Sequence, residues 1–413
     1  MSFVAAMLHC DNYRMTTLDH PLSQSLAPTA FAGAIAMAVA MGFGRFSYTP
    51  ILPGMMADLG LSPADAGLIA SANFVGYLVG AVAAGYGWAT GRERLISLSA
   101  LVATAVLLLA MGLTSSLLMF SVIRFLAGVA SAFTMIFTSA IVLSRGLAAG
   151  NPHVQSIHFG GVGIGIAVSS LMVFLLPAGG FCVLAGWQAA WFGGAIIACI
   201  GTVIAASLLP SGPAVGKSTE KEKPMVWTRP LFVITLTYGL FGFGYVITAT
   251  FLVAMARQGA TDHTVEFLAW LITGLSAAVS VHLWRRAVPR LGIVGVYLAG
   301  LLVEAVGLVL AVSLPSPYAP LIGGLMLGLT FIMVTAYGLQ IGRALAPQSP
   351  RKALAFMTAA FGVGQIIGPL VAGWLAQGSG SFTVPTLLAA GVLLFCAVLT
   401  WMEMRRIVTA AGE

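Results

Sequence analysis

Two arginines lie inside apolar stretches that are long enough to cross a membrane. Arg45 belongs to the sequence GFGRFSYTPILP at 42–53, and Arg124 belongs to a later stretch at a similar predicted depth. An unpaired guanidinium near the middle of a bilayer costs at least about 2.5 kcal/mol, so it normally faces protein or water and marks a path for solutes. A guanidinium also holds a carboxylate through two parallel hydrogen bonds. The pair therefore predicts a site for an organic anion, or for a neutral solute with a strong acceptor group.

Other interpretations of the two arginines stay open. Arg45 could extend its side chain to the outer interface from a short helix. Both arginines could also donate hydrogen bonds to carbonyl groups at helix ends and hold the protein together. In the first stretch Gly42 and Gly44 allow close approach of neighbouring backbone, and two prolines remove amide donors and bend or unwind its outer end.

Neutral polar side chains accompany the arginines at mid-membrane positions. Tyr48 shares a helical face with Arg45, while Asn73 and Tyr77 recur among glycines in the next stretch. Such phenols and amides can orient a solute, but they are equally expected as hydrogen bonds between helices. The predicted substrate-binding residues are Arg45, Tyr48, Asn73, Tyr77, Arg124, Tyr245 and Gln365.

Two titratable groups are candidates for binding a coupling proton. His158 carries the side chain whose unperturbed pKa lies nearest neutrality, although a packed or hydrated structural histidine is the alternative. Glu304 is the single carboxylate deep in any apolar stretch. Because burial disfavours the charged form, we expect an isolated Glu304 to be neutral, or else paired.

The composition restricts the class of protein. Apolar residues make up 59% of the chain, charged residues only 8%, and the mean hydropathy is +1.00, which excludes a soluble globule. The excess of 19 Lys and Arg over 12 Asp and Glu is spread between apolar stretches instead of forming a patch, so no nucleic-acid partner is expected. The four cysteines have neither metal nor redox spacing. We therefore expect no metal, no cofactor and no enzyme activity, since no nucleophile is paired with a base.

Apolar stretches of membrane-spanning length predict an all-α polytopic protein with twelve transmembrane helices. A polar linker at 210–229 separates an N-terminal six-helix half, 28–209, from a C-terminal half, 230–404. The predicted spans are 28–57, 64–88, 95–114, 117–143, 154–176, 187–209, 230–255, 265–284, 292–312, 318–342, 354–376 and 383–402.

The basic residues predict the orientation. With the N-terminus inside, sixteen of the nineteen Lys and Arg residues fall in cytoplasmic segments, Arg257 alone falls outside, and Arg45 and Arg124 lie within the membrane. The N-terminal segment 1–27, the linker and the tail 405–413 are then cytoplasmic. The first 25 residues lack a basic region followed by an apolar one, so no cleaved signal is expected. This pattern is typical of a multi-pass protein of the bacterial inner membrane.

The two halves share sequence features at corresponding places. The tripeptide Gly-Phe-Gly at 42–44 recurs at 242–244, and Gly128 matches Gly328 at the same offset. Parallel repeats of six spans are the construction of one large class of transporters.

The chain resembles transporters of the major facilitator superfamily, and in particular its YbfB/YjiJ branch, over about residues 28–404. The resemblance rests on GFGRFSYTPILP, on AGLIASANFVGYLVGA at 66–81, on HFGGVGIGI at 158–166, and on the Arg124-x-x-x-Gly128 pattern. The loop at 85–95 keeps the glycine and arginine of the usual loop motif but lacks its aspartate.

The resemblance implies a fold and a function. It implies a central cavity lined by the first, fourth, seventh and tenth helices, with the third, sixth, ninth and twelfth outside, so that Glu304 becomes peripheral. It also implies a monomeric secondary active carrier that moves a small solute across the lipid bilayer by alternating access, with or without a coupling proton. Our expectation is an organic anion, and the alternative is efflux of amphipathic drugs.

Overall fold

The computed structural model describes residues 26–151, 153–176, 184–213, 223–259 and 262–412. Twelve helical spans in this part of the chain are long and apolar enough to cross a membrane. The first span is continuous but has three parts, namely α1 (Leu26–Met37), a π-helical segment η1 (Ala38–Phe46) and α2 (Tyr48–Leu59). The remaining spans of the first half are α3 (Pro63–Gly85), α4 (Glu93–Gly112), α5 (Leu117–Ala148), α6 (His153–Leu175) and α7 (Gly186–Leu208).

The second half is also built from six spans. They are α8 (Arg229–Gly259), α9 (His263–Arg285), α10 (Val288–Ser313), α11 (Tyr318–Leu345), α12 (Pro350–Ser379) and α13 (Thr383–Ala411). The predicted fold class and span count are confirmed, and most boundaries agree within a few residues. The last helix is the main difference, because it continues to Ala411, with Ile407 fully buried and Glu403 paired to Arg229.

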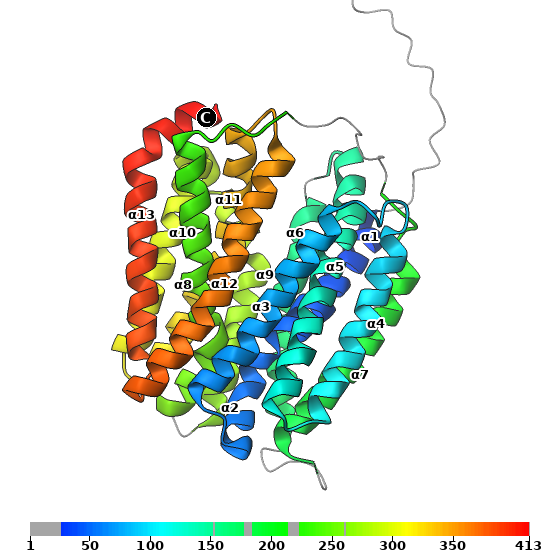
Figure 1. Ribbon diagram of the computed structural model, residues 1–413, viewed down its shortest axis with the longest axis vertical. Helices are drawn as coiled ribbons and strands as arrows, with labels where there is room; N and C mark the ends of the chain where they lie inside the picture. The colour runs from blue at the N-terminus through cyan, green and yellow to red at the C-terminus, as the bar shows by residue number, and fades with distance from the viewer. Residues whose placement is uncertain (1–25, 152, 177–183, 214–222, 260–261, 413) are drawn as a thin grey trace, which may run out of the picture.

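The two halves lie side by side (Figure 1), with α4 and α7 at one edge and α10 and α13 at the other. The end of α13, the end of α7 and the start of α8 lie at the same end of the bundle, here called the linker end. The opposite end, where α3 begins at Pro63, is called the far end.

Equivalent helices pack in the same way in both halves. A Cβ atom added to Gly128 on α5 would overlap the carbonyl oxygen of Asn73 on α3, and one added to Gly328 on α11 would overlap the carbonyl oxygen of Thr273 on α9. Both pairs of positions differ by 200 residues, the offset at which the tripeptide recurs. The repeat noticed in the sequence therefore extends to the packing of backbone on backbone.

Helices from different halves meet where α3 crosses α12, where α6 crosses α9 and where α2 lies against α8. At α3 and α12, a Cβ on Gly67 would overlap the carbonyl oxygen of Pro369, and Ser71 Oγ donates a hydrogen bond to the Ile366 carbonyl over 2.8 Å. At α6 and α9, Ser170 Oγ donates to the Phe267 carbonyl over 2.9 Å. These contacts hold the halves together through small residues and side-chain hydroxyls, which is how helices associate in lipid.

The peripheral helices present apolar surface to the surroundings. The large apolar side chains Val102 on α4, Ile200 on α7, Leu302 on α10 and Trp401 on α13 are all exposed. These are the third, sixth, ninth and twelfth spans, which the resemblance placed outside. A soluble domain would bury such side chains, whereas a bilayer solvates them.

The backbone contact at Gly128 predicts a sensitivity to added volume. Gly128→Ala forces α3 and α5 apart, so we expect a lower melting temperature in detergent, corresponding to roughly 1–3 kcal/mol of overpacking. Gly391→Ala is the matched control, because Gly391 lies within α13 and has nothing within 4 Å of an added Cβ. If both variants melt like the parent, the close approach of α3 and α5 is wrong.

Candidate functional site

The site is organised around the change of helix type in the first span. In the π-helical segment η1 each backbone hydrogen bond joins residues five apart, instead of four apart as in an α-helix. Pro50 has no amide hydrogen to give to a carbonyl group one turn before it. Gly42 also packs so closely on Gly165 of α6 that any side chain at this position would overlap backbone. The Arg45 carbonyl, five residues before Pro50, therefore lacks an amide donor in the π-helical pattern and can accept from another helix.

Arg124 on α5 supplies that donor. Its Nη1 donates to the Gly44 carbonyl and its Nη2 to the Arg45 carbonyl, both over 2.9 Å. The guanidinium carbon lies 5.0 Å from the centre of the Tyr48 ring, and the side chain is only 2% exposed. Arg124 thus has the carbonyl-binding geometry that was the structural interpretation of the arginines.

Three predicted site residues hold the surrounding helices. Asn73 Nδ2 donates to the Arg124 carbonyl over 2.9 Å, and the Tyr48 hydroxyl donates to the Ala66 carbonyl over 3.0 Å. The Tyr77 hydroxyl contacts the Met135 sulfur at 2.6 Å. These three donors are thus engaged with protein, whereas Asn73 Oδ1 is buried without a partner, and the Tyr77 ring is turned toward Arg45.

Arg45 differs from Arg124 in having no acceptor for most of its donors. It is 4% exposed, and its Nε and Nη2 atoms have no hydrogen-bond partner. Aromatic rings surround its guanidinium carbon, with centres at 4.5 Å for Phe74, 4.6 Å for Tyr77 and 5.5 Å for Phe46. Within the described residues Arg45 takes part in none of the ion pairs. Rings attract a cation through their faces but cannot accept its N–H groups in the way that a carboxylate does.

The second half faces Arg45 with aromatic rings and one amide. Phe331 on α11 lies 6.0 Å from Phe46 and stacks on Tyr245 of α8 at 5.8 Å and 5°. Gln365 on α12 donates through Nε2 to the Tyr245 hydroxyl, and its Oε1 has no partner. The polar contacts of Tyr48, Asn73, Tyr77 and Arg124 thus lie within the first half and that of Tyr245 with Gln365 within the second, and the contact between Phe46 and Phe331 joins the two groups.

The two proton candidates make their hydrogen bonds to residues other than the seven predicted binding residues. His158 is fully buried within the first half, where Nε2 lies 2.8 Å from Ser139 Oγ and Nδ1 lies against Gly33. Glu304 is fully buried between α10 and α11, with Oε2 2.9 Å from Thr330 Oγ1 and Oε1 without a partner. Thr330 Oγ1 also lies 2.6 Å from the Met326 carbonyl oxygen. The hydroxyl has a single hydrogen, so it can donate to only one of these two acceptors. When that hydrogen goes to Met326, the contact with Glu304 needs a neutral carboxyl that donates to Thr330.

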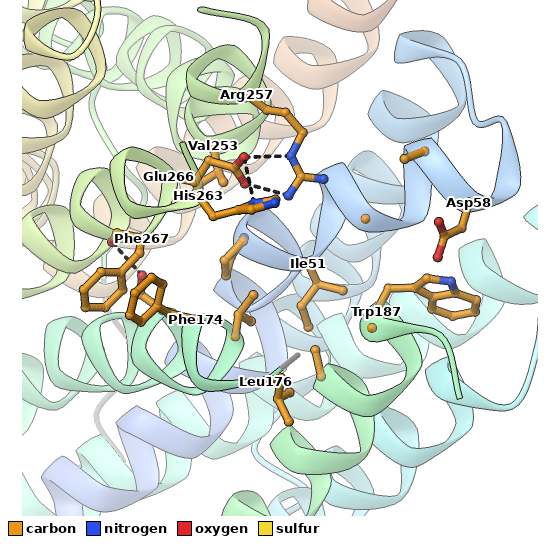
Figure 2. Close-up of a pocket in the computed structure, with 17 residues that line it drawn as sticks. Ile51, Asp58, Phe174, Leu176, Trp187, Val253, Arg257, His263, Glu266 and Phe267 are labelled. Carbon is orange, nitrogen blue, oxygen red and sulfur yellow. Dashed lines mark hydrogen bonds and ion pairs between the residues drawn. The ribbon is translucent and has the colours of Figure 1, made fainter. Parts of the chain in front are cut away.

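The structure also contains a chamber at the far end that the sequence interpretation missed. It has a volume of about 390 Å³ and lies between α2, α6 and α7 of the first half and α8 and α9 of the second. Figure 2 shows Arg257, Glu266 and His263 grouped on one side, and Asp58 beside Trp187 on the other. Arg257 holds Glu266 through two hydrogen bonds of 2.8 and 2.7 Å, and His263 Nδ1 lies 3.4 Å from the same carboxylate.

A signal for this chamber was present in the sequence. His263 and Glu266 share one helix face directly after the short connection that follows Arg257, the single basic residue predicted outside. Asp262 caps α9, and the Thr264 amide that donates to its carboxylate holds the pKa of Asp262 below its ordinary value. Charged residues on both sides of the short connection between α8 and α9 thus mark the rim of a cavity between the halves.

Comparison with known proteins identifies the family. The family described as "Uncharacterised MFS-type transporter YbfB" matches residues 37–401. The chain belongs to this family of the major facilitator superfamily. Among its relatives, the uncharacterised MFS-type transporter YhhS of Salmonella enteritidis is 28% identical over 274 residues, which are 63% of this chain and 64% of that protein. YceJ of Bacillus subtilis, another uncharacterised MFS-type transporter, is 26% identical over 373 residues, 84% of this chain and 89% of YceJ.

Solved structures share the family's fold. The nucleoside transporter NupG superposes with a TM-score of 0.69 and 16% identity, covering 92% of this chain and 99% of NupG. A bacterial homologue of the lysosomal transporter Spinster, in an inward-facing and occupied conformation, superposes with a TM-score of 0.65 and 14% identity. The match covers 92% of this chain and 96% of that protein. At these identities the likeness concerns the fold alone. The predicted superfamily and branch are confirmed by the family match over residues 37–401.

The different partners of the two arginines predict different effects on stability. Arg124→Lys removes at least one of two charge-assisted bonds to carbonyl groups, so we expect a loss of about 1–3 kcal/mol in the free energy of unfolding. Arg45→Lys keeps a cation among the rings and breaks no recorded bond, so it should cost less in ligand-free protein. Melting temperatures of the two variants, measured side by side in detergent, test this order. The opposite order would contradict it.

Proposed function

We propose that this MFS-type transporter carries a small organic anion, and that Arg45 supplies the positive charge that binds it. The observation that carries the proposal is the buried guanidinium of Arg45, whose Nε and Nη2 donors have no partner within the protein. A carboxylate is the ligand that uses both donors at once, through two parallel hydrogen bonds. Arg124, already engaged with two carbonyl groups, acts as a positioning residue that holds the η1 backbone in place.

Electrostatic energy supports an anion over a neutral solute. Two guanidiniums in a poorly solvated region repel one another, and each resists transfer from water. No carboxylate of the described residues pairs with either arginine. A bound anion offsets both costs, so its binding is favoured by the protein that surrounds it.

Alternating access would use the contacts between the halves. The hydrogen bonds of Ser71 to Ile366, Ser170 to Phe267 and Thr49 to Ala249 join the halves in the far-end part of their spans. Rocking about these contacts would open one end of the bundle while closing the other. The arrangement supports a state that is closed toward the far end, which is inward-facing if the linker end is cytoplasmic.

A neutral aromatic solute, such as a nucleoside, is the second candidate. It is favoured by the rings of Phe331 and Tyr245 beside the free amide oxygen of Gln365, and by the likeness of fold to a protein titled as a nucleoside transporter. Such a ligand would stack on the rings and leave Arg45 unpaired. The two candidates therefore differ in their dependence on Arg45.

Arg45→Lys separates the two candidates. We expect the variant to lose at least about tenfold in affinity for an anionic substrate, because a lysine cannot reproduce the two parallel hydrogen bonds. The measurement is a thermal-shift screen of purified protein against organic acids and nucleosides, followed by calorimetry of each ligand found. Its control is a melting curve of the ligand-free variant. Anion binding that survives in a stable Arg45→Lys protein would argue for a structural role of Arg45.

The distribution of basic residues gives the proposed transporter an orientation in the membrane. We propose that both termini and the linker face the cytoplasm of a bacterium, on the basis of the distribution of basic residues. A reporter that works only in the cytoplasm should then be active when it is fused after Glu413, and a reporter that works only in the periplasm should be inactive there. Periplasmic activity of that fusion would overturn the proposed topology.

Proton coupling, where present, is not expected to require Glu304. Glu304→Gln keeps a donor to Thr330 without a charge, so the variant should fold normally and keep most of the pH dependence of uptake. Uptake into vesicles at several pH values measures this. Loss of the pH dependence in a variant with an unchanged melting temperature would make Glu304 the proton carrier.

A further inference from the structure

Aromatic rings of the second half form a nearly parallel array, and one of them, Phe331, contacts Phe46 of the first half. Tyr245 stacks on Phe331 at 5°, on Phe361 at 12° and on Phe241 at 18°, with ring centres between 5.2 and 5.8 Å apart. Tyr238 extends the array, since it stacks on Phe361 at 4.9 Å and 26°. Rings with such a common orientation present their faces to a planar group more readily than to a branched or puckered one.

The array is connected to Arg45 through Phe46. The Phe46 ring lies 5.5 Å from the Arg45 guanidinium carbon and meets Phe331 edge-on at 6.0 Å. It also contacts Trp270 of α9 at 6.5 Å. These ring contacts cross between the two halves. A ligand ring that enters there would replace contacts between protein rings by contacts with its own ring, so little buried apolar area is lost. Such a balance suits a site that must both bind and release its ligand.

One polar edge interrupts the aromatic surface. Gln365 is 1% exposed, and only one of its two polar groups has a partner, the Tyr245 hydroxyl. If the amide is turned over, the oxygen takes the hydroxyl hydrogen and the nitrogen is left without a partner. In either orientation a buried polar atom next to the array is unsatisfied. Such an atom costs about 1–3 kcal/mol unless a ligand supplies its partner.

We infer that the substrate is a planar aromatic acid, with its carboxylate on Arg45, its ring against the array of Phe331 and Tyr245, and a hydroxyl or amino substituent on the amide of Gln365. This inference rests on the proposed function, because Arg45 is its anion site. It adds two requirements, a flat ring and a polar substituent remote from the carboxylate. Short aliphatic acids meet neither requirement.

Matched ligands test the ring requirement. The parent protein is titrated by calorimetry with 4-hydroxybenzoate and with trans-4-hydroxycyclohexanecarboxylate, which carry the same polar groups on a flat and on a puckered ring. We expect the aromatic acid to bind at least tenfold more tightly. Equal affinity of the two acids, with both lost in Arg45→Lys, would overturn the inference and leave the proposed function standing.

Matched variants test the polar edge. In Gln365→Leu we expect 4-hydroxybenzoate to fall to the affinity of benzoate, whereas in Gln340→Leu, an exposed position on α11, the preference for the hydroxyl should remain. A preference retained in Gln365→Leu would overturn the inference. Binding of adenosine that is insensitive to Arg45→Lys, without binding of any acid, would overturn both the inference and the proposed function.

Discussion

The structure depends on the hydrogen bonds between Arg124 and the carbonyl groups of Gly44 and Arg45. In the π-helical pattern of η1 the Arg45 carbonyl would pair with residue 50, which is a proline and contributes no amide hydrogen. A buried carbonyl without a donor is costly in a membrane, and a guanidinium without an acceptor is more so. The carbonyl groups and the Arg124 guanidinium therefore satisfy one another. The bonds fix the backbone of Arg45, so that its own side chain is held among the rings of Phe74 and Tyr77.

Close backbone contacts set the distances within which this arrangement forms. Gly128 brings α5 against α3 one turn below Arg124, and Gly42 brings η1 against Gly165 of α6. The same contact at Gly328 in the second half places Phe331, less than one turn further on, beside Tyr245. The repeat thus provides two similar helix arrangements that hold different side chains. The first half holds the two arginines, and the second half holds the stacked aromatic rings. A solute bound between them would contact both halves, which is what a rocking carrier requires.

The sequence was sufficient for the fold and insufficient for the division of roles within the site. Hydropathy, the distribution of basic residues and the repeated Gly-Phe-Gly predict twelve spans in two halves, because span length and solvation dominate helix formation in a bilayer. The same reasoning treated Arg45 and Arg124 as equivalent. Their difference depends on the π-helical register of η1, a change of one residue per turn that composition and periodicity do not report. The chamber around Arg257 and Glu266 was missed for a related reason, since it is formed by five helices from both halves.

The central claim, that Arg45 holds the anionic group of the solute, is tested most directly by locating a bound acid. A structure of the protein with 4-bromobenzoate, phased on the anomalous signal of bromine, places the ring without interpretation of weak density. The account predicts a carboxylate within about 3 Å of the Arg45 guanidinium nitrogens and a bromine directed toward Tyr245 and Gln365. Bromine density confined to the far-end chamber beside Arg257, with the Arg45 donors still unpaired, would contradict it.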